Sequence, residues 1–340
     1  MIVKYYSVNS PFRHPFTISK GTKTHQPALI VELEHMGIKG YGEAPAIAYY
    51  KIPVEKMIED LIAKKPYIEK FALTDPERYW HFLHHLFPAN PFLVCALDMA
   101  GWDLFAKMRR KKCYELWGEN ITNVPLTDYT IGIDTKEKMV EKIKEFPWPI
   151  YKIKLGTDQD VEIITELRKH TNSLFRIDAN AAWKAEEALE KIIAFKDLNV
   201  ELIEQPLDKE DWEGMKFLFE KSPLPLFADE SCVNENDVLK CHEHFHGINI
   251  KLTKCSGITP ARRMIKHAKS LGMKVMLGTM NETSIGSAAI AQLATMVEYL
   301  DMDGPLLLAK DTAKSIDYLD GRIIYADSPG LGITTLDLPE

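Results

Sequence analysis

The feature that most constrains the fold is a regular alternation of apolar and helical segments from about residue 125 onward. Eight short, β-rich runs follow one another: PLTDYTIGI, PIYKIKLG, LFRIDAN, VELIEQP, PLFADES, GINIKLT, KVMLGT and YLDMDG. Between them lie segments such as KAEEALEKIIAFK, whose apolar residues recur at helical spacing. Strands that alternate with helices form parallel βαβ units. Eight such strands favour a closed (β/α) barrel over an open doubly wound sheet.

The amino-terminal part of the chain has a different pattern. LIVELEHMGIKGYGEAP predicts a hairpin that turns at Gly37, and the segments PVEKMIEDLIAKK, DPERYWHFLHHLF and FLVCALDMAGWDLFAKM predict three consecutive helices. We therefore expect an α+β capping domain over residues 1–120 and a (β/α)7β TIM-like barrel over residues 121–314. DYLDGRIIYADSPGLGI predicts a second hairpin that packs on the amino-terminal part, so that residues 315–340 complete the capping domain.

Composition excludes several classes of protein. The 340 residues are 46% hydrophobic and 27% charged, and no apolar run approaches the roughly 20 residues that a membrane-spanning helix needs. The start, MIVKYYSVNS, has no features of a secretion signal, so we expect a cytoplasmic protein with no membrane partner. The net charge is −7 without a long basic run, so we expect a small-molecule substrate rather than nucleic acid. We also expect a homo-oligomer.

Cysteine usage points away from disulfides and from zinc. The five cysteines form no CxxC pair, so we expect reduced, structural thiols. The stretch HEHFH matches the zinc-protease pattern H-E-x-x-H through His242, Glu243 and His246. It precedes the sixth strand on the outer helical layer and has no evident third ligand. We therefore expect no zinc site there.

Charged and polar side chains stand near the carboxyl ends of the predicted barrel strands, where barrel chemistry gathers. They are Lys152 and Lys154 on the second strand, Asp178 and Asn180 on the third, Glu204 on the fourth, Asp229 on the fifth and Lys251 on the sixth. From Lys154 onward, the strand-end residues are 22 to 26 residues apart, about one βα unit. Strand side chains alternate between faces, so Lys152 and Lys154 point the same way. This even spacing predicts a ring of charged groups.

Three of these residues are carboxylates on neighbouring strands. Asp178, Glu204 and Asp229 would repel one another strongly unless a cation neutralised them. A set of oxygen ligands without His or Cys favours Mg²⁺, or Mn²⁺, over zinc. The sequence therefore predicts a divalent metal site at the barrel mouth.

The lysines flank this metal site. A metal that binds a substrate carboxylate stabilises the enediolate formed when the α-proton leaves, and a neutral lysine can take that proton. Lys154 and Lys251 would lie on opposite sides of the metal, and Lys152 and the metal would both disfavour the charged form of Lys154. A base on each face permits 1,1-proton transfer, which is racemisation or epimerisation.

The eighth strand carries a further acidic pair, Asp301 and Asp303, which share a face by the same alternation. In a ring of eight strands this pair lies across the barrel mouth from the metal, and two anions there would attract a cation. The alternative is a capping and turn role before Gly304 and Pro305. A substrate with a carboxylate at the metal and an ammonium group at this pair has the shape of a dipeptide.

An ordered set of motifs now indicates a family. The motifs are GYGEAP, KIK, DAN, EQP, ADES, NIKLTK and GLGI, and they cover nearly the whole length of the chain. In this the chain resembles the muconate lactonizing enzyme subgroup of the enolase superfamily, and most of all its dipeptide epimerases of the L-Ala-D/L-Glu type. Each motif alone is weakly specific, whereas the ordered set is highly specific.

The resemblance implies a role for each of these residues. Asp178, Glu204 and Asp229 would bind Mg²⁺, and Lys154 and Lys251 would be the two acid/base groups. Lys152 would help to bind the substrate carboxylate, and Asp301 with Asp303 would hold the dipeptide α-ammonium group. We also expect substrate contacts from Thr130 and Asn180.

Two loops of the capping domain would read the substrate side chain, as the resemblance implies. They are TISKGTKTH and AIAYYKIP. Relatives that act on Ala-Glu can place an arginine in the first loop, but this chain has no arginine between Arg13 and Arg78. Lys20 or Lys23 could take its place as a point charge, without the bidentate geometry of arginine. The expected substrate is L-Ala-D/L-Glu.

Two alternatives remain open at this stage. One is another activity of the same subgroup: an N-acylamino-acid racemase, an o-succinylbenzoate synthase or a muconate cycloisomerase. Substrates of those enzymes carry an acyl group or a second carboxylate where Asp301 and Asp303 would repel it. The other is a catalytically silent metal-binding or scaffold protein on the same fold, against which the intact pair Lys154 and Lys251 argues.

Overall fold

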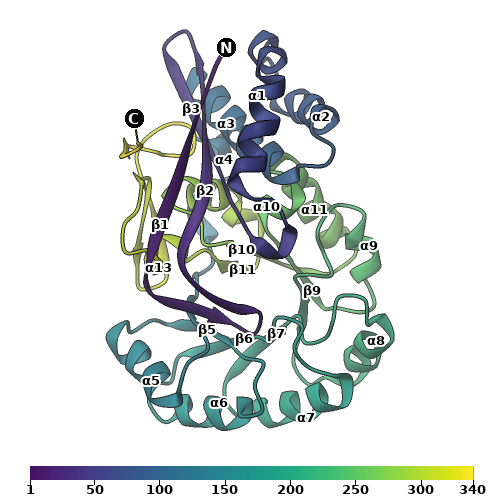
Figure 1. Cartoon of the computed structure of the whole chain (residues 1–340). Helices are drawn as coiled ribbons and strands as arrows, with labels where there is room; N and C mark the ends of the chain where they lie inside the picture. The colour runs from purple at the N-terminus through teal and green to yellow at the C-terminus, as the bar shows by residue number, and fades with distance from the viewer. Residues whose placement is uncertain (340) are drawn as a thin grey trace.

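A three-stranded antiparallel sheet forms the amino-terminal part of this computed structural model. β1 (Ile2–Ile18) pairs with β2 (Gly21–His35), which pairs with β3 (Ile38–Pro45). The β2–β3 turn falls at Met36 and Gly37, which both have positive φ, so the predicted hairpin is confirmed. The β1–β2 hairpin reaches far beyond β3 and ends over the barrel (Figure 1).

The three predicted helices are present. They are α1 (Val54–Lys70), α2 (Pro76–Leu86) and α3 (Pro91–Met108). Helices α1 and α3 pack on this sheet, and α2 packs on α3. The side chains of Asp75 and Asn90 accept backbone N–H groups at the starts of α2 and α3, and each is followed by a proline at the first helical position. Turn-forming polar residues therefore define where these two helices begin.

Helix α3 lies very close to β3. A Cβ atom added at Gly42 would lie 2.0 Å from the backbone oxygen of Ala96, and one added at Gly40 would lie 2.4 Å from that of Ala100. Only glycine permits such an approach of strand and helix. The two glycines of the GYGEAP motif therefore serve packing within the capping domain.

Eight parallel strands form the second part of the molecule, and they match the eight predicted runs. They are β4 (Tyr129–Ile131), β5 (Ile150–Lys154), β6 (Leu174–Asp178), β7 (Val200–Glu204), β8 (Leu226–Ala228), β9 (Gly247–Ile250), β10 (Lys274–Gly278) and β11 (Tyr299–Asp301). They are paired in sequence order from β4 to β11.

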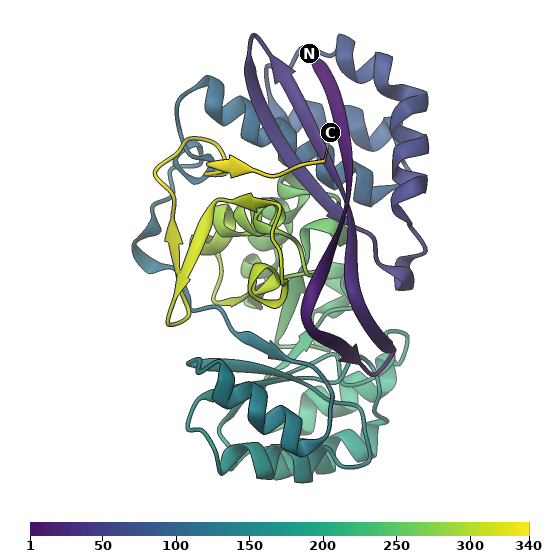
Figure 2. The same cartoon turned by 60° about the vertical axis from the view of Figure 1, so that its left-hand side comes forward.

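Helices surround the strands on the outside (Figures 1 and 2). The longer ones are α5 (Lys136–Glu145), α6 (Asp160–Arg168), α7 (Ala185–Phe195), α8 (Trp212–Lys221), α9 (Asp237–Cys241), α11 (Ile258–Ser270) and α12 (Ser284–Leu293). Three single-turn helices are α4 (Cys113–Leu116), α10 (Leu252–Cys255) and α13 (Gly304–Leu307). The predicted (β/α)7β architecture is confirmed.

The barrel closes where β4 meets β11. A parallel bridge joins Thr127 to Leu300, and the N–H of Asp128 donates to the Leu300 carbonyl at 3.2 Å. Arg176 of β6 reaches across the interior to the same place, donating to that carbonyl at 2.7 Å and to Asp128 Oδ2 at 2.9 Å. A buried guanidinium therefore reinforces the short seam.

The carboxy-terminal segment lies beside the barrel (Figure 2). The predicted hairpin is present as β13 (Ile316–Leu319) and β14 (Arg322–Tyr325), and β12 (Ala313–Lys314) pairs with β15 (Thr335–Leu336).

The carboxy-terminal segment contacts both the barrel and the amino-terminal part of the chain. The hydroxyl of Tyr318 donates to the Met302 carbonyl, and that of Tyr325 donates to the Ala291 carbonyl of α12. A buried tyrosine hydroxyl needs an acceptor, and these barrel carbonyls supply it.

The Tyr325 ring packs edge-on against Tyr114, and the N–H of Cys113 donates to the Gly330 carbonyl at 3.2 Å. The segment after the hairpin also reaches the capping domain, where the Leu331 N–H donates to Asp103 in α3. The expectation that residues 315–340 complete the capping domain stays a prediction.

No helix within residues 1–339, the part of the chain that the structure describes, is long and apolar enough to cross a membrane. The division of the chain at residues 120 and 314 stays a prediction.

Candidate active site

Three carboxylates meet at the carboxyl ends of adjacent strands. Asp178 ends β6, Glu204 ends β7, and Asp229 directly follows β8. One oxygen from each lies within 4.8 Å of the others, and all three residues are buried. The parallel register pairs Asp178 with Glu204, which holds these two side chains at the same height. The structure therefore brings together the three metal ligands expected from the sequence.

The electrostatics of this carboxylate group favour a cation. Burial and the neighbouring charge of Asp178 raise the pKa of Glu204 to about 7. Burial also acts to raise the pKa of Asp229, but the adjacent lysines Lys251 and Lys254 outweigh it and hold the pKa well below its usual range. An all-oxygen donor set of this kind fits Mg²⁺.

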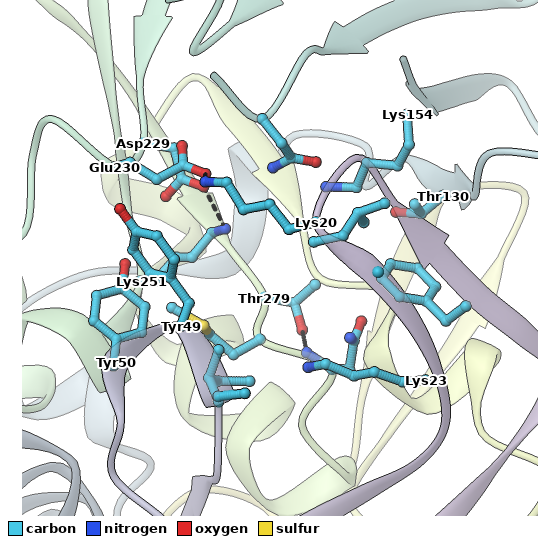
Figure 3. Close-up of a pocket in the computed structure, with 18 of the residues that line it drawn as sticks. Lys20, Lys23, Tyr49, Tyr50, Thr130, Lys154, Asp229, Glu230, Lys251 and Thr279 are labelled. Atoms are coloured by element: carbon cyan, nitrogen blue, oxygen red, sulfur yellow. Dashed lines mark hydrogen bonds and ion pairs between the residues drawn. The ribbon is translucent and has the colours of Figure 1, made fainter. Parts of the chain in front are cut away.

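Two lysines flank the carboxylates. Lys154, at the end of β5, places Nζ 2.6 Å from Asp178 Oδ2, and Lys251, just after β9, places Nζ 2.7 Å from Asp229 Oδ2. The strands that carry the carboxylates, β6 to β8, lie between β5 and β9. The two ammonium groups therefore enter the cavity from opposite sides (Figure 3).

Asp229 favours the protonated form of Lys251. Burial alone would lower the pKa of this lysine, but the charge of Asp229 outweighs burial and raises the pKa above its usual value.

Lys152 lies deeper than Lys154, although both side chains share the inner face of the strand. Its Nζ lies 2.7 Å from Glu204 Oε2, 2.7 Å from Asp301 Oδ2 and 3.2 Å from Asp178 Oδ2, and the residue is 1% exposed. Burial disfavours its charge, but these carboxylates, Asp301 first, raise its pKa well above the usual value. Lys152 thus links two of the three candidate metal ligands to Asp301, across the mouth.

The acidic pair of the eighth strand is divided between two positions. Asp301 ends β11 and lines the cavity, whereas Asp303 is fully buried behind Thr130, whose backbone N–H donates to Asp303 Oδ2 at 2.6 Å. Burial and the charge of Asp301 raise the pKa of Asp303 to about 7. Asp303 occupies the N-cap position of α13, but its side chain makes no capping hydrogen bond. Asp303 therefore stands where a helix-capping residue would stand, but its carboxylate does not cap the helix.

A cavity of about 280 Å³ opens above these groups (Figure 3). Its barrel wall includes Thr130, Lys154, Asn180, Asp229, Glu230, Lys251, Thr279, Asn281 and Asp301. Both predicted capping loops contribute the opposite wall, through Ile18, Lys20, Lys23, Ile47, Tyr49 and Tyr50 among others, and Phe16, just before the first loop, adds to it. The cavity is therefore charged at its base and largely apolar towards the capping domain.

The two capping-loop lysines have different partners. Lys20 Nζ lies 3.3 Å from Glu230 Oε1 and 4.3 Å from the centre of the Tyr49 ring. Lys23 donates to the neutral Gln26 side chain at 3.3 Å. Burial, together with the nearby cations Lys251 and Lys154, lowers the pKa of Lys23.

Sequence reasoning missed two residues that hold the carboxylates of the candidate metal site. Lys254 is 2% exposed and donates to Asp229 Oδ1 at 2.6 Å, and Asn249 donates to Glu204 Oε1 at 2.9 Å. The sequence positions of both residues relative to Lys251 could have indicated them. Asn249 precedes Lys251 by two positions and so shares its face of the strand, and Lys254 lies about one helical turn after Lys251.

The H-E-x-x-H match has no metal-binding geometry. His242 follows the last residue of α9, and His246 accepts the Leu226 N–H through Nδ1. Zinc proteases present this motif on one face of a helix, which residues 242–246 do not form. Among residues 1–339, the Asp178, Glu204 and Asp229 group alone brings three potential metal ligands together.

Comparison with known families identifies the fold. Residues 2–118 match the mandelate racemase/muconate lactonizing enzyme N-terminal domain, and residues 134–337 match the enolase C-terminal domain-like family. The chain belongs to the enolase superfamily. The predicted resemblance is confirmed.

Individual relatives from this superfamily are similar over the whole chain. An L-Ala-D/L-amino acid epimerase of Flavobacterium johnsoniae is 48% identical over 336 residues, which are 99% of each chain. A substrate-liganded L-Ala-D/L-Glu epimerase of Bacillus subtilis superposes with a TM-score of 0.94 at 28% identity, covering 99% of both chains. A dipeptide epimerase of Cytophaga hutchinsonii, complexed with Mg and D-Ala-L-Val, has a TM-score of 0.91 at 28% identity, covering 98% of this chain and 96% of that one. The prediction of an enolase-superfamily isomerase is confirmed.

Proposed function

We propose that this chain is a Mg²⁺-dependent dipeptide epimerase, which inverts the α-carbon of the carboxy-terminal residue by 1,1-proton transfer. The observation that carries the proposal is the placement of Lys154 and Lys251 on opposite sides of the carboxylate group (Figure 3). A base on one face can remove the α-proton, and an acid on the other face can return a proton with inversion. The epimerase relatives support this assignment.

The carboxylate group at the base of the cavity is the proposed metal site. Asp178, Glu204 and Asp229 hold Mg²⁺, and Mn²⁺ can replace it because both ions prefer oxygen ligands. A bound divalent cation stabilises the negative charge that develops on the substrate carboxylate when the α-proton leaves. General acid–base catalysis contributes about 10²–10⁴-fold, which is too little for so weak a carbon acid without that stabilisation.

The two lysines exchange roles with the direction of the reaction. The lysine on the side of the departing proton must be neutral, and the opposite lysine must carry a proton. Asp229 favours the protonated form of Lys251, which suits Lys251 as the proton donor for one stereoisomer. After each turnover the protonation states of Lys154 and Lys251 are exchanged.

The remaining polar groups orient the dipeptide. Asp301 and Asp303 attract the α-ammonium group, with Asp301 at the cavity wall and Asp303 behind it. Thr130 and Asn180 line the cavity and are assigned to the substrate backbone. Lys152 assists at the substrate carboxylate from its position beneath the cavity, between the metal ligands and Asp301.

The favoured substrate is L-Ala-D/L-Glu, with the side chain of the second residue towards the capping loops. Lys20 and Lys23 line that wall and carry the positive charge that a glutamate side chain requires. Each acts as a point charge and so offers less geometric selectivity than an arginine.

The test is incubation of the purified protein with Mg²⁺ and a dipeptide library in D₂O. Epimerase activity should introduce deuterium at the α-carbon of the carboxy-terminal residue, which mass spectrometry detects. A parallel incubation with N-succinyl-glutamate measures the competing racemase activity. Faster turnover of N-succinyl-glutamate than of Ala-Glu would refute the proposal, and no exchange with any compound would indicate a silent protein.

A further inference from the structure

Glu230 presents an incompletely satisfied carboxylate to the cavity. The residue lines the cavity wall directly after the proposed metal ligand Asp229, and it is 8% exposed. Its Oε1 contacts Lys20 Nζ at 3.3 Å, whereas its buried Oε2 has no hydrogen-bond partner within residues 1–339. A buried carboxylate with a free oxygen is a position that attracts a positive charge.

The partner of Glu230 is loosely held. The Lys20 side chain is 36% exposed, and its 3.3 Å distance from Glu230 is longer than the 2.6 and 2.7 Å contacts of Lys154 and Lys251. Lys20 stands at the turn between β1 and β2, whereas Glu230 belongs to the barrel. Lys20 can therefore leave Glu230 without disturbing the barrel.

The Lys20 ammonium group neutralises the Glu230 carboxylate at one end of the cavity (Figure 3). Lys20 occupies the Glu230 carboxylate, while the contact of Lys23 is the uncharged Gln26. A cationic substrate side chain would have to displace Lys20 from Glu230 and approach Lys23, with like charges repelling in both places. An uncharged side chain requires neither change, and an anionic one is attracted to Lys23.

We propose that the Lys20–Glu230 ion pair sets the charge selectivity of the side-chain site, admitting uncharged and acidic residues and excluding basic ones by keeping Glu230 occupied. This inference rests on the proposed dipeptide epimerase activity. Removal of the charge of Lys20 uncovers Glu230 as a binding position for a lysine side chain.

The experiment compares L-Ala-L-Lys with the uncharged reference L-Ala-L-Gln. For wild type, Lys20→Met and Lys20→Met/Glu230→Gln, the ratio of kcat/KM for the two dipeptides is measured at saturating Mg²⁺. Lys20→Met should raise the L-Ala-L-Lys to L-Ala-L-Gln ratio by about tenfold or more, a size typical of gaining one charged partner. The added Glu230→Gln change should return the ratio to near that of wild type.

Exposed Lys216, on α8 of the outer helical layer, provides the control as Lys216→Met and should leave the ratio unaltered. An unchanged ratio in Lys20→Met, or a raised ratio that persists in the double variant, would overturn the inference. If Lys20→Met turned over neither dipeptide, the same ratio taken from calorimetric dissociation constants would decide. Failure of wild type to epimerise any dipeptide would instead refute the proposed function.

Discussion

At the scale of single residues, Asp229 shares its two carboxylate oxygens between two buried lysines. Lys254 contacts Oδ1 at 2.6 Å and Lys251 contacts Oδ2 at 2.7 Å. Lys254 also donates to the Asn249 carbonyl and is shielded from water, so it fixes the orientation of the Asp229 side chain. Lys251 faces the cavity and remains available to substrate. Lys254 thus orients Asp229, whereas Lys251, three positions earlier, faces the substrate cavity.

The two proposed acid/base lysines should be separable by isotope exchange. Lys154→Ala should abolish inversion in the presence of Mg²⁺, yet leave α-deuterium exchange from the one stereoisomer whose proton faces Lys251. Lys251→Ala should show the reverse preference. Deuterium incorporation into each stereoisomer is followed by mass spectrometry, with the exposed Lys216→Ala as control. Loss of exchange from both isomers in either variant would contradict separate roles.

Removal of Lys254 should destabilise the fold. Lys254→Met takes one of the two cations from buried Asp229, which keeps Lys251, and losing a hydrogen bond to a charged group typically costs about 1.5–3 kcal/mol of unfolding free energy. Denaturant titration measures the loss, and the exposed Lys216→Met should change stability by less than about 0.5 kcal/mol. Equal stability of the two variants would show that Lys254 does not hold Asp229.

At the scale of elements, the barrel depends on the seam between β4 and β11. The bridge between Thr127 and Leu300 is short, so Arg176 supplies much of the polar contact there through the Leu300 carbonyl and Asp128. Arg176 also contacts Glu201 Oε2 at 2.8 Å. A side chain from β6 therefore helps to join two strands, neither of which is its direct neighbour in the sheet order.

Arg176→Met should loosen this seam. The substitution leaves Asp128 as a buried carboxylate without its cation, and we expect a loss of about 3–5 kcal/mol in unfolding free energy. Backbone amides of residues 127–130 should exchange hydrogen faster, as mass spectrometry would show. Adding Asp128→Asn should recover part of the stability, and the exposed Arg322→Met should have little effect. Unaltered exchange at the seam would refute this role of Arg176.

At the scale of the whole molecule, buried carboxylates join the capping domain to the barrel. Glu43 of β3 accepts the N–H and hydroxyl of Thr283 and the N–H of Gly286, at the start of α12. Asp98 of α3 accepts the N–H and hydroxyl of Thr259 in α11. Both capping loops line the cavity, and these two contacts help to position them over the barrel, together with the hydrogen bond from the Ile133 N–H to the Thr17 carbonyl.

The Glu43 contact should depend on pH. Burial raises the pKa of Glu43 from 4.5 to about 7, despite the hydrogen bonds from Thr283 and Gly286, and the nearby Glu282 acts in the same direction as burial. The folded protein thus retains a proton that the unfolded chain releases, so this residue's contribution to stability falls between about pH 4.5 and pH 7 and levels off above. A shift of this size corresponds to about 3 kcal/mol.

Glu43→Gln mimics the protonated carboxyl and removes this pH dependence. Relative to wild type, the variant should become more stable by about 3 kcal/mol as pH rises from 5 to 8, measured by denaturant unfolding. Glu220→Gln, an exposed change on α8, should show no such trend. A stability difference between Glu43→Gln and wild type that is constant with pH would contradict the prediction.

Much of the fold and the candidate site could be predicted from the sequence. Apolar runs at regular spacing identified all eight barrel strands because a strand that is buried on both faces consists mostly of apolar residues. The carboxyl ends of parallel strands meet at one edge, so Asp178, Glu204 and Asp229 had to converge once the strands were known. Local periodicity and topology therefore determined the fold class, the capping helices and the convergence of the three carboxylates that could hold a metal.

Only the tertiary structure decided which charges are partners. Lys20 and Lys23 are three positions apart, yet one faces Glu230 and the other Gln26. Lys254 and Asp303 likewise acquire their contacts from other strands, and the tyrosine hydroxyls of the carboxy-terminal hairpin find their acceptors in the barrel. These outcomes depend on distances of a few ångströms between segments remote in the chain, and ion pairs and hydrogen bonds form only at such distances. Sequence periodicity determines the face of a strand or helix on which a side chain lies, but not which residue of another element it contacts.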